Sequence, residues 1–166
     1  MASRTFEDRT RLDTGNLAIR PMTPAIGAEI GDIDLAAADI ADKIPDIRAA
    51  LLKYGVIFFR DQDLTPAQHI AFARHFGDLE IHPATPKDQP DPQVLHIAHG
   101  PKSRGSENAW HSDVTWRECP SLGSILRAVE VPDCGGDTLF ANMHLAYERL
   151  SPQMQRLCSG LTAVHD

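Results

Sequence analysis

His111 and Asp113, separated by one residue, form the most compact metal-ligand spacing in the sequence. In an extended segment, side chains i and i+2 point to the same side, so this imidazole and this carboxylate can reach one ion. With a second, distant histidine they would make the facial triad of non-haem Fe(II) sites, which leaves coordination positions open for further ligands. Three protein ligands and an open position would also suit Zn²⁺, so the spacing alone leaves the metal undecided.

The residues around this pair strengthen the interpretation, because a histidine and an aspartate at this spacing also occur by chance. Trp110 precedes the pair and Val114-Thr-Trp116 follows it, so the ligands lie in an apolar, aromatic segment. Further along, Gly135-Gly-Asp-Thr138 predicts a tight turn that leads into a strand. The remaining histidines have no partner at ligand spacing, and the three cysteines are isolated, which predicts free thiols at Cys119, Cys134 and Cys158.

Three segments have the apolar periodicity and end signals of helices. Behind Pro45, apolar residues recur on one face as far as Gly55, so we place Pro45 in the first turn and Gly55 at the end. Thr65-Pro66 predicts an N-cap and first turn for a second helix, which stops at Gly77. Residues 146–157 predict a third helix that breaks near Ser151-Pro152.

Short strand-like segments dominate the second part of the chain, whereas helices are concentrated before it. Four prolines make residues 83–92 a loop between the two parts. The pattern predicts a β-rich core with helices packed on one face. The expected strands are residues 17–21, 27–35, 56–60, 94–98, 124–131, 138–141 and 161–164.

Length and charge limit the classes of partner. The chain has 166 residues, 16 basic against 23 acidic, and a net charge of −7. No basic stripe of the kind that binds a phosphate backbone is present in the sequence, so we expect no nucleic-acid partner. The longest apolar runs are too short for a membrane span, and residues 1–16 are polar without an apolar signal core. We therefore expect a cytoplasmic protein with no membrane partner and a flexible arm over residues 1–16.

Six spaced blocks resemble, in order, the N-terminal half of the taurine dioxygenase (TauD/TfdA) family of Fe(II)- and 2-oxoglutarate-dependent oxygenases. The resemblance begins near residue 17 and continues to residue 166. Several blocks in a family's order are far more specific than one histidine–aspartate spacing. The blocks are residues 54–62, 76–83, 110–116, 135–140, 146–151 and 159–166.

The resemblance implies an α+β, mostly β fold: a double-stranded β-helix (jelly-roll, cupin-like) core with flanking helices. Residues 17–166 would be the N-terminal portion of one such dioxygenase domain, incomplete at the C-terminus. The implied cofactors are Fe(II), the cosubstrate 2-oxoglutarate and O₂. The implied partner is a small organic acid, and we expect a homo-oligomer.

The resemblance also implies roles for individual residues. His111 and Asp113 would be catalytic as two of three iron ligands, and Thr138 would bind the cosubstrate carboxylate through its hydroxyl. Substrate contacts would come from a histidine that meets the substrate anion, from two pocket-lining residues and from a family asparagine. These are His82, Val114, Trp116 and Asn108, with Glu107 at the asparagine position if the loop is not shifted by one residue. A carboxylate at that position would repel an anionic substrate.

Members of this family run to nearly twice this length, and their distal histidine ligand and 2-oxoglutarate-binding arginine lie in the second half. A jelly-roll divided midway leaves unpaired strand edges. We therefore expect a parent enzyme that hydroxylates taurine or another sulfonate, whereas the 166-residue chain alone should be inactive. The alternatives are a related alkylsulfatase or aryloxyalkanoate dioxygenase, or a catalytically incomplete chain that acts only as a binding or assembly module.

Overall fold

The computed structural model describes residues 17–83, 85–86, 88–100 and 109–164. Contacts divide the chain into two compact units. The first comprises Met1–Asp63 and Pro132–Leu161, and the second comprises Leu64–Val131 and Thr162–Asp166. The arm expected over residues 1–16 lies outside the described residues.

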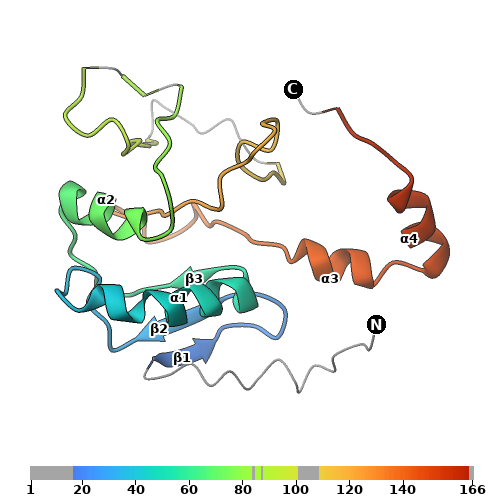
Figure 1. The fold of residues 1–166 in the computed structure, drawn as a ribbon, viewed down its shortest axis with the longest axis horizontal. Helices are drawn as coiled ribbons and strands as arrows, with labels where there is room; N and C mark the ends of the chain where they lie inside the picture. Colours follow the sequence, from blue (N-terminus) through green and yellow to red (C-terminus); the bar gives the residue numbers. More distant parts are fainter. Residues whose placement is uncertain (1–16, 84, 87, 101–108, 165–166) are drawn as a thin grey trace. The chain divides into compact units, whose positions relative to one another are not determined.

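A three-stranded sheet forms the centre of the first unit (Figure 1). Its strands are β1 (Ala18–Pro21), β2 (Ala28–Gly31) and β3 (Ile57–Phe58). β2 lies in the middle, antiparallel to β1 and parallel to β3. These strands confirm the first three expected from the sequence. The inward residues of β2, Ala28 and Ile30, are at most 1% exposed, which is the alternation that a half-buried strand requires.

Helix α1 (Ile40–Tyr54) supplies the crossover that a parallel β2–β3 pairing needs and lies along the sheet in Figure 1. Gly55 ends the helix as predicted, with φ of 73° and its N–H donating to Leu51 O. The prediction that Pro45 stands in the first turn is wrong, because α1 begins at Ile40 and contains Pro45 in its interior. Ile40 is buried and lies two turns before the buried Ile47, so packing of this face extends the helix toward the N-terminus.

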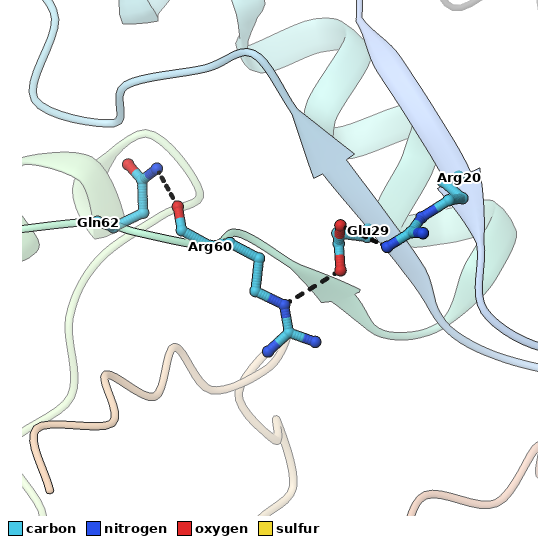
Figure 2. Close-up of polar contacts among 4 residues, drawn as sticks. All are labelled: Arg20, Glu29, Arg60 and Gln62. Carbon is cyan, nitrogen blue, oxygen red and sulfur yellow. Dashed lines mark hydrogen bonds and ion pairs between the residues drawn. The ribbon is translucent and has the colours of Figure 1, made fainter.

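Gln62 holds the chain that leaves β2 against the chain that leaves β3. Its Oε1 accepts the N–H of Leu35 at 2.9 Å, and its Nε2 donates to Ile33 O at 2.9 Å. The same Nε2 donates to Arg60 O at 2.8 Å, as Figure 2 shows. Leu35 is only 5% exposed, so one amide satisfies backbone groups at the edge of the core.

Two arginines share the Glu29 carboxylate on the sheet surface (Figure 2). Arg60 Nε lies 3.1 Å from Oε2, and Arg20 Nη2 lies 2.8 Å from Oε1. The hydrogen bond from Arg60 is the largest cause that lowers the pKa of Glu29 below its ordinary value of 4.5, and Arg20 acts in the same direction. Desolvation of the carboxylate opposes the shift, but it does not reverse the direction.

The C-terminal part of the first unit contains α3 (Met143–Glu148) and α4 (Pro152–Ser159). The break between them, with Ser151 as the N-cap of α4, confirms the interruption predicted near Ser151-Pro152. Asn142 caps α3 and also donates from Nδ2 to Ala25 O at 2.8 Å. The Phe140 ring meets the Phe58 ring edge to face, with 6.1 Å between centroids. These contacts tie the C-terminal part of this unit to its sheet.

The second unit begins with α2 (Pro66–Arg74), which has the predicted N-cap. Thr65 Oγ1 accepts the N–H of Gln68, whose side chain in turn accepts the N–H of Thr65, so a capping box satisfies two backbone donors. Phe72 faces inward at 3% exposure. The helix ends at Arg74, before the predicted stop at Gly77.

Four of the predicted strands do not form. Residues 94–98, 124–131, 138–141 and 161–164 are irregular in the described part of the chain. Large apolar side chains in these segments stay exposed, from 38% for Leu95 to 95% for Val164. A strand is stabilised by hydrogen bonds to a neighbouring strand, and sequence patterning identifies its propensity without supplying that neighbour. The jelly-roll core therefore stays a prediction.

Two further predictions concern cysteines and membranes. Cys119, Cys134 and Cys158 are free thiols, as expected from their isolation in the sequence. Within the residues that the structure describes, none of the helices has the length and apolar character to cross a membrane.

Candidate metal centre

The structure brings His111 and Asp113 together. His111 Nε2 lies 3.4 Å from Asp113 Oδ1, and both side chains are more than half exposed. The chain turns immediately after the pair, since Arg117 N donates to Val114 O at 3.1 Å. Val114 has a φ of 49°, which is left-handed and costly for a β-branched residue. The turn therefore begins at Asp113, and Val114 within it has a strained backbone conformation.

A backbone carbonyl orients the His111 ring. His111 Nδ1 lies 3.0 Å from Ala109 O, and a carbonyl oxygen can only accept a hydrogen bond. When Nδ1 carries the proton and donates to this carbonyl, Nε2 keeps the lone pair that a metal binds. Because Nε2 also faces Asp113, the tautomer and the ring orientation both suit metal ligation by this atom.

Ser124 orients the other side of the pair. Its Oγ donates to Asp113 Oδ2 at 2.9 Å, so the two carboxylate oxygens have different surroundings. Oδ1 faces the His111 imidazole and Oδ2 faces the serine hydroxyl. Sequence reasoning missed Ser124, because a serine within a strand-like segment has no feature that marks it as the partner of a distant aspartate.

The donor atoms of this pair fit a divalent transition metal in part. An imidazole nitrogen and a carboxylate oxygen at this separation are two of the three donors in a 2-His-1-carboxylate triad. Among the residues placed by the structure, no group of three or more His, Cys, Asp and Glu side chains gathers around one point. Two of the three predicted ligands therefore lie close together, and their role in metal binding stays a prediction.

An ion pair joins Arg117, the residue after Trp116, to Glu80, two residues before His82. Arg117 pairs with Glu80, which also accepts a hydrogen bond from Ser121 Oγ at 2.9 Å. The Arg117 guanidinium lies over the Trp116 ring, 4.9 Å from its centroid. Trp116 is 56% exposed and His82 is exposed, so both are open to a small molecule rather than buried in a core.

The sequence matches the family model for the taurine catabolism dioxygenase TauD, TfdA family over residues 18–166. The chain belongs to this family. The resemblance predicted from the six sequence blocks is thereby confirmed.

Two curated relatives of this TauD/TfdA chain carry different names. It is 37% identical over 150 residues to the alpha-ketoglutarate-dependent sulfate ester dioxygenase of Pseudomonas putida, covering 90% of this chain and 49% of that protein. It is 35% identical over 153 residues to an alkylsulfatase of Acinetobacter baylyi, covering 92% of this chain and 48% of that protein. The chain spans about half the length of the curated relatives it matches.

A solved structure supports the fold of the TauD/TfdA chain. A taurine dioxygenase from Burkholderia xenovorans matches with a TM-score of 0.74 and 37% identity. The match covers 88% of this chain and 52% of that one. The chain therefore matches about half of a longer dioxygenase.

Two further predicted site positions of the TauD/TfdA chain are Thr138 and Asn108. Thr138 is exposed and belongs to the first unit, whereas His111 and Asp113 belong to the second. The turn before Thr138 is present, because Gly135 and Gly136 have positive φ of 81° and 72°. Asn108 and the alternative Glu107 lie outside the described residues.

Proposed function

We propose that the protein hydroxylates a small organic acid as an Fe(II)- and 2-oxoglutarate-dependent dioxygenase. One observation carries the proposal: within a TauD/TfdA family match over residues 18–166, an oriented imidazole and a carboxylate oxygen lie 3.4 Å apart. Residues 17–166 act in this proposal as the N-terminal portion of one dioxygenase domain. The distal histidine and the 2-oxoglutarate arginine come from the portion that the longer relatives carry in addition.

Different residues of this chain bind the metal and the cosubstrate. His111 Nε2 and Asp113 Oδ1 hold the metal, and Thr138 binds a carboxylate of 2-oxoglutarate through its hydroxyl. Bound Fe(II) and 2-oxoglutarate supply the activation of O₂ and the oxidation of the substrate carbon, with release of succinate and CO₂. The protein's part is to hold the substrate carbon beside the metal and to exclude water.

The substrate is an organic acid, with taurine or another sulfonate favoured. His82 meets the substrate anion, Val114 and Trp116 line its apolar part, and Asn108 contributes a polar contact. The relatives named above include enzymes for sulfate esters, so an alkyl sulfate is the next candidate and aryloxy acids follow. A sulfonate hydroxylated beside its sulfur would release sulfite and an aldehyde.

The test compares the 166-residue chain with a chimera in which residue 166 is followed by the remaining half of the Burkholderia xenovorans taurine dioxygenase. Both proteins are loaded anaerobically with Fe(II), supplied with 2-oxoglutarate and O₂, and offered taurine, an alkyl sulfate or an aryloxy acid. We expect succinate from the chimera with at least one acid, and none from the 166-residue chain. Metal analysis of the protein as purified distinguishes iron from zinc.

His111→Ala in the chimera should abolish succinate release, and His75→Ala is the matched control because His75 is an exposed histidine at the end of α2. Succinate release by the 166-residue chain alone would refute the requirement for a second half. A folded chimera that is inert with every acid, although it binds Fe(II), would favour a binding or assembly module instead. Size-exclusion chromatography of the chimera tests the proposed homo-oligomer.

A further inference from the structure

We propose that Ser124 is a positioning residue for the metal, because its hydroxyl holds the Asp113 carboxylate with Oδ1 turned toward the ion. This inference rests on the proposed function, since it takes His111 and Asp113 as the metal ligands. The contact that carries it is the 2.9 Å hydrogen bond from Ser124 Oγ to Asp113 Oδ2.

The hydrogen bond selects one orientation of the carboxylate. Rotation about the last side-chain bond of an aspartate is soft and roughly two-fold, and Asp113 is 61% exposed, so packing alone does not fix the plane. A donor at Oδ2 holds that oxygen back and leaves Oδ1 at 3.4 Å from His111 Nε2. Without the hydroxyl, water would solvate both oxygens and the carboxylate would have to be ordered again on metal binding.

Two neighbouring contacts hold Ser124 in place within the second unit. The next residue, Ile125, accepts a hydrogen bond at its carbonyl oxygen from His69 Nε2 of α2, at 3.2 Å. Three residues earlier, Ser121 donates to Glu80 at 2.9 Å. The segment that carries the Ser124 hydroxyl is therefore anchored on both sides, to a helix and to the Glu80 segment. His69 is half-buried and has this structural role.

With Ser124, each of the two proposed ligands has a hydrogen-bond partner on its side away from the metal. His111 has a carbonyl partner in Ala109 on the ring nitrogen away from the metal, and Asp113 has the Ser124 hydroxyl on the oxygen away from it. Outer partners of this kind orient ligands and set their basicity, and removing one typically weakens metal binding by about 10–100-fold. Ser124 would contact the ion only through Asp113, so its effect passes through that carboxylate.

The experiment measures Mn²⁺ binding to the 166-residue chain from the electron spin resonance signal of the free ion. Paramagnetic broadening of the His111 ring-proton resonances shows whether the ion binds at this site. The variants are Ser124→Ala, Ser124→Thr and His111→Ala, and Ser121→Ala is the matched control that removes a hydroxyl three residues away. We expect Ser124→Ala to raise the Mn²⁺ Kd by about 10-fold or more. Ser124→Thr, which keeps a hydroxyl, and Ser121→Ala should stay within about 3-fold of the parent.

The outcomes separate the two proposals. If His111→Ala removes binding but Ser124→Ala binds Mn²⁺ as tightly as the parent, the role of Ser124 is refuted and the metal site stands. If the parent itself shows no His111-dependent binding, the metal site and the Ser124 inference both fall. If Ser121→Ala weakens binding as much as Ser124→Ala, the loss belongs to the segment as a whole, and the role of the Ser124 hydroxyl is again refuted.

Discussion

Replacing Ile47 by alanine is expected to destabilise the first unit more than any surface substitution on the same helix. Ile47 is fully buried, at 0% exposure, on the face of α1 that is turned away from solvent. The core of this unit is small, and Ile47 is one of only two described side chains of large volume below 2% exposure, the other being Ile30. A cavity at this position has few neighbours that can move to fill it.

The size of the effect follows from the atoms removed. Ile→Ala deletes three carbons, and at about 0.8 kcal/mol for each buried carbon the transfer term alone is about 2.4 kcal/mol. The residual cavity adds to this loss of stability, whereas the higher helix propensity of alanine offsets about 0.4 kcal/mol of it. We therefore expect Ile47→Ala to lower the free energy of unfolding by about 2–4 kcal/mol, a large fraction of a typical domain's stability.

Leu52→Ala is the matched control, because it also deletes three carbons from α1 but at a position that is 72% exposed. Its expected effect is below about 0.5 kcal/mol. Urea unfolding followed by far-ultraviolet circular dichroism measures both variants, and equal slopes would show that only stability changed. Equal losses for Ile47→Ala and Leu52→Ala would refute the assignment of the buried face of α1.

Three further predictions concern the cap of α2, the arginine-bound carboxylate and the turn beside the metal pair. Thr65→Ala removes the acceptor of the Gln68 N–H and should lower the unfolding free energy by about 0.5–2 kcal/mol in urea titrations, whereas no loss would contradict the capping box. Glu29 has a lowered pKa, so its stabilisation is complete above pH 4.5 and is lost as the pH falls through the folded-state value. Glu29→Gln should therefore flatten the acid limb of a stability–pH curve, and an unchanged limb would argue against the arginine contacts. Val114 has a left-handed backbone, and replacing it with glycine relieves about 1–2 kcal/mol of strain. In urea titrations Val114→Gly should therefore destabilise the protein less than Val131→Gly, and the reverse order would contradict the turn.

Features with local causes could be predicted from the sequence. The α2 cap depends on Thr65, Pro66 and Gln68, which are within one turn of each other, and Gly55 ends α1 through its own backbone freedom. The closeness of His111 and Asp113 follows from their separation by one residue. The family blocks are likewise runs of neighbouring residues, and the family assignment drawn from them is confirmed.

Whether a strand-like segment finds a distant partner could not be predicted from its own residues. The segment 124–131 has the apolar composition of a strand, but a strand also needs a neighbour, and the described part of this chain provides none for it. Pro45 favours the first turn of a helix, but burial of Ile40 extends α1 toward the N-terminus. Propensity is a weak influence, and packing of an apolar face readily overrides it.

The sequence by itself determined the family, the N-cap of α2, the end of α1 at Gly55 and the spacing of the two proposed ligands, because each depends on residues close together in the chain. Only the tertiary structure decided which side chains support them. The hydroxyl of Ser124 reaches Asp113 from eleven residues away, and the amide of Gln62 reaches the backbone of Leu35 from twenty-seven. Such contacts form when packing brings separate segments within hydrogen-bond distance, and serine and glutamine residues that do so are no different in sequence from those that face solvent.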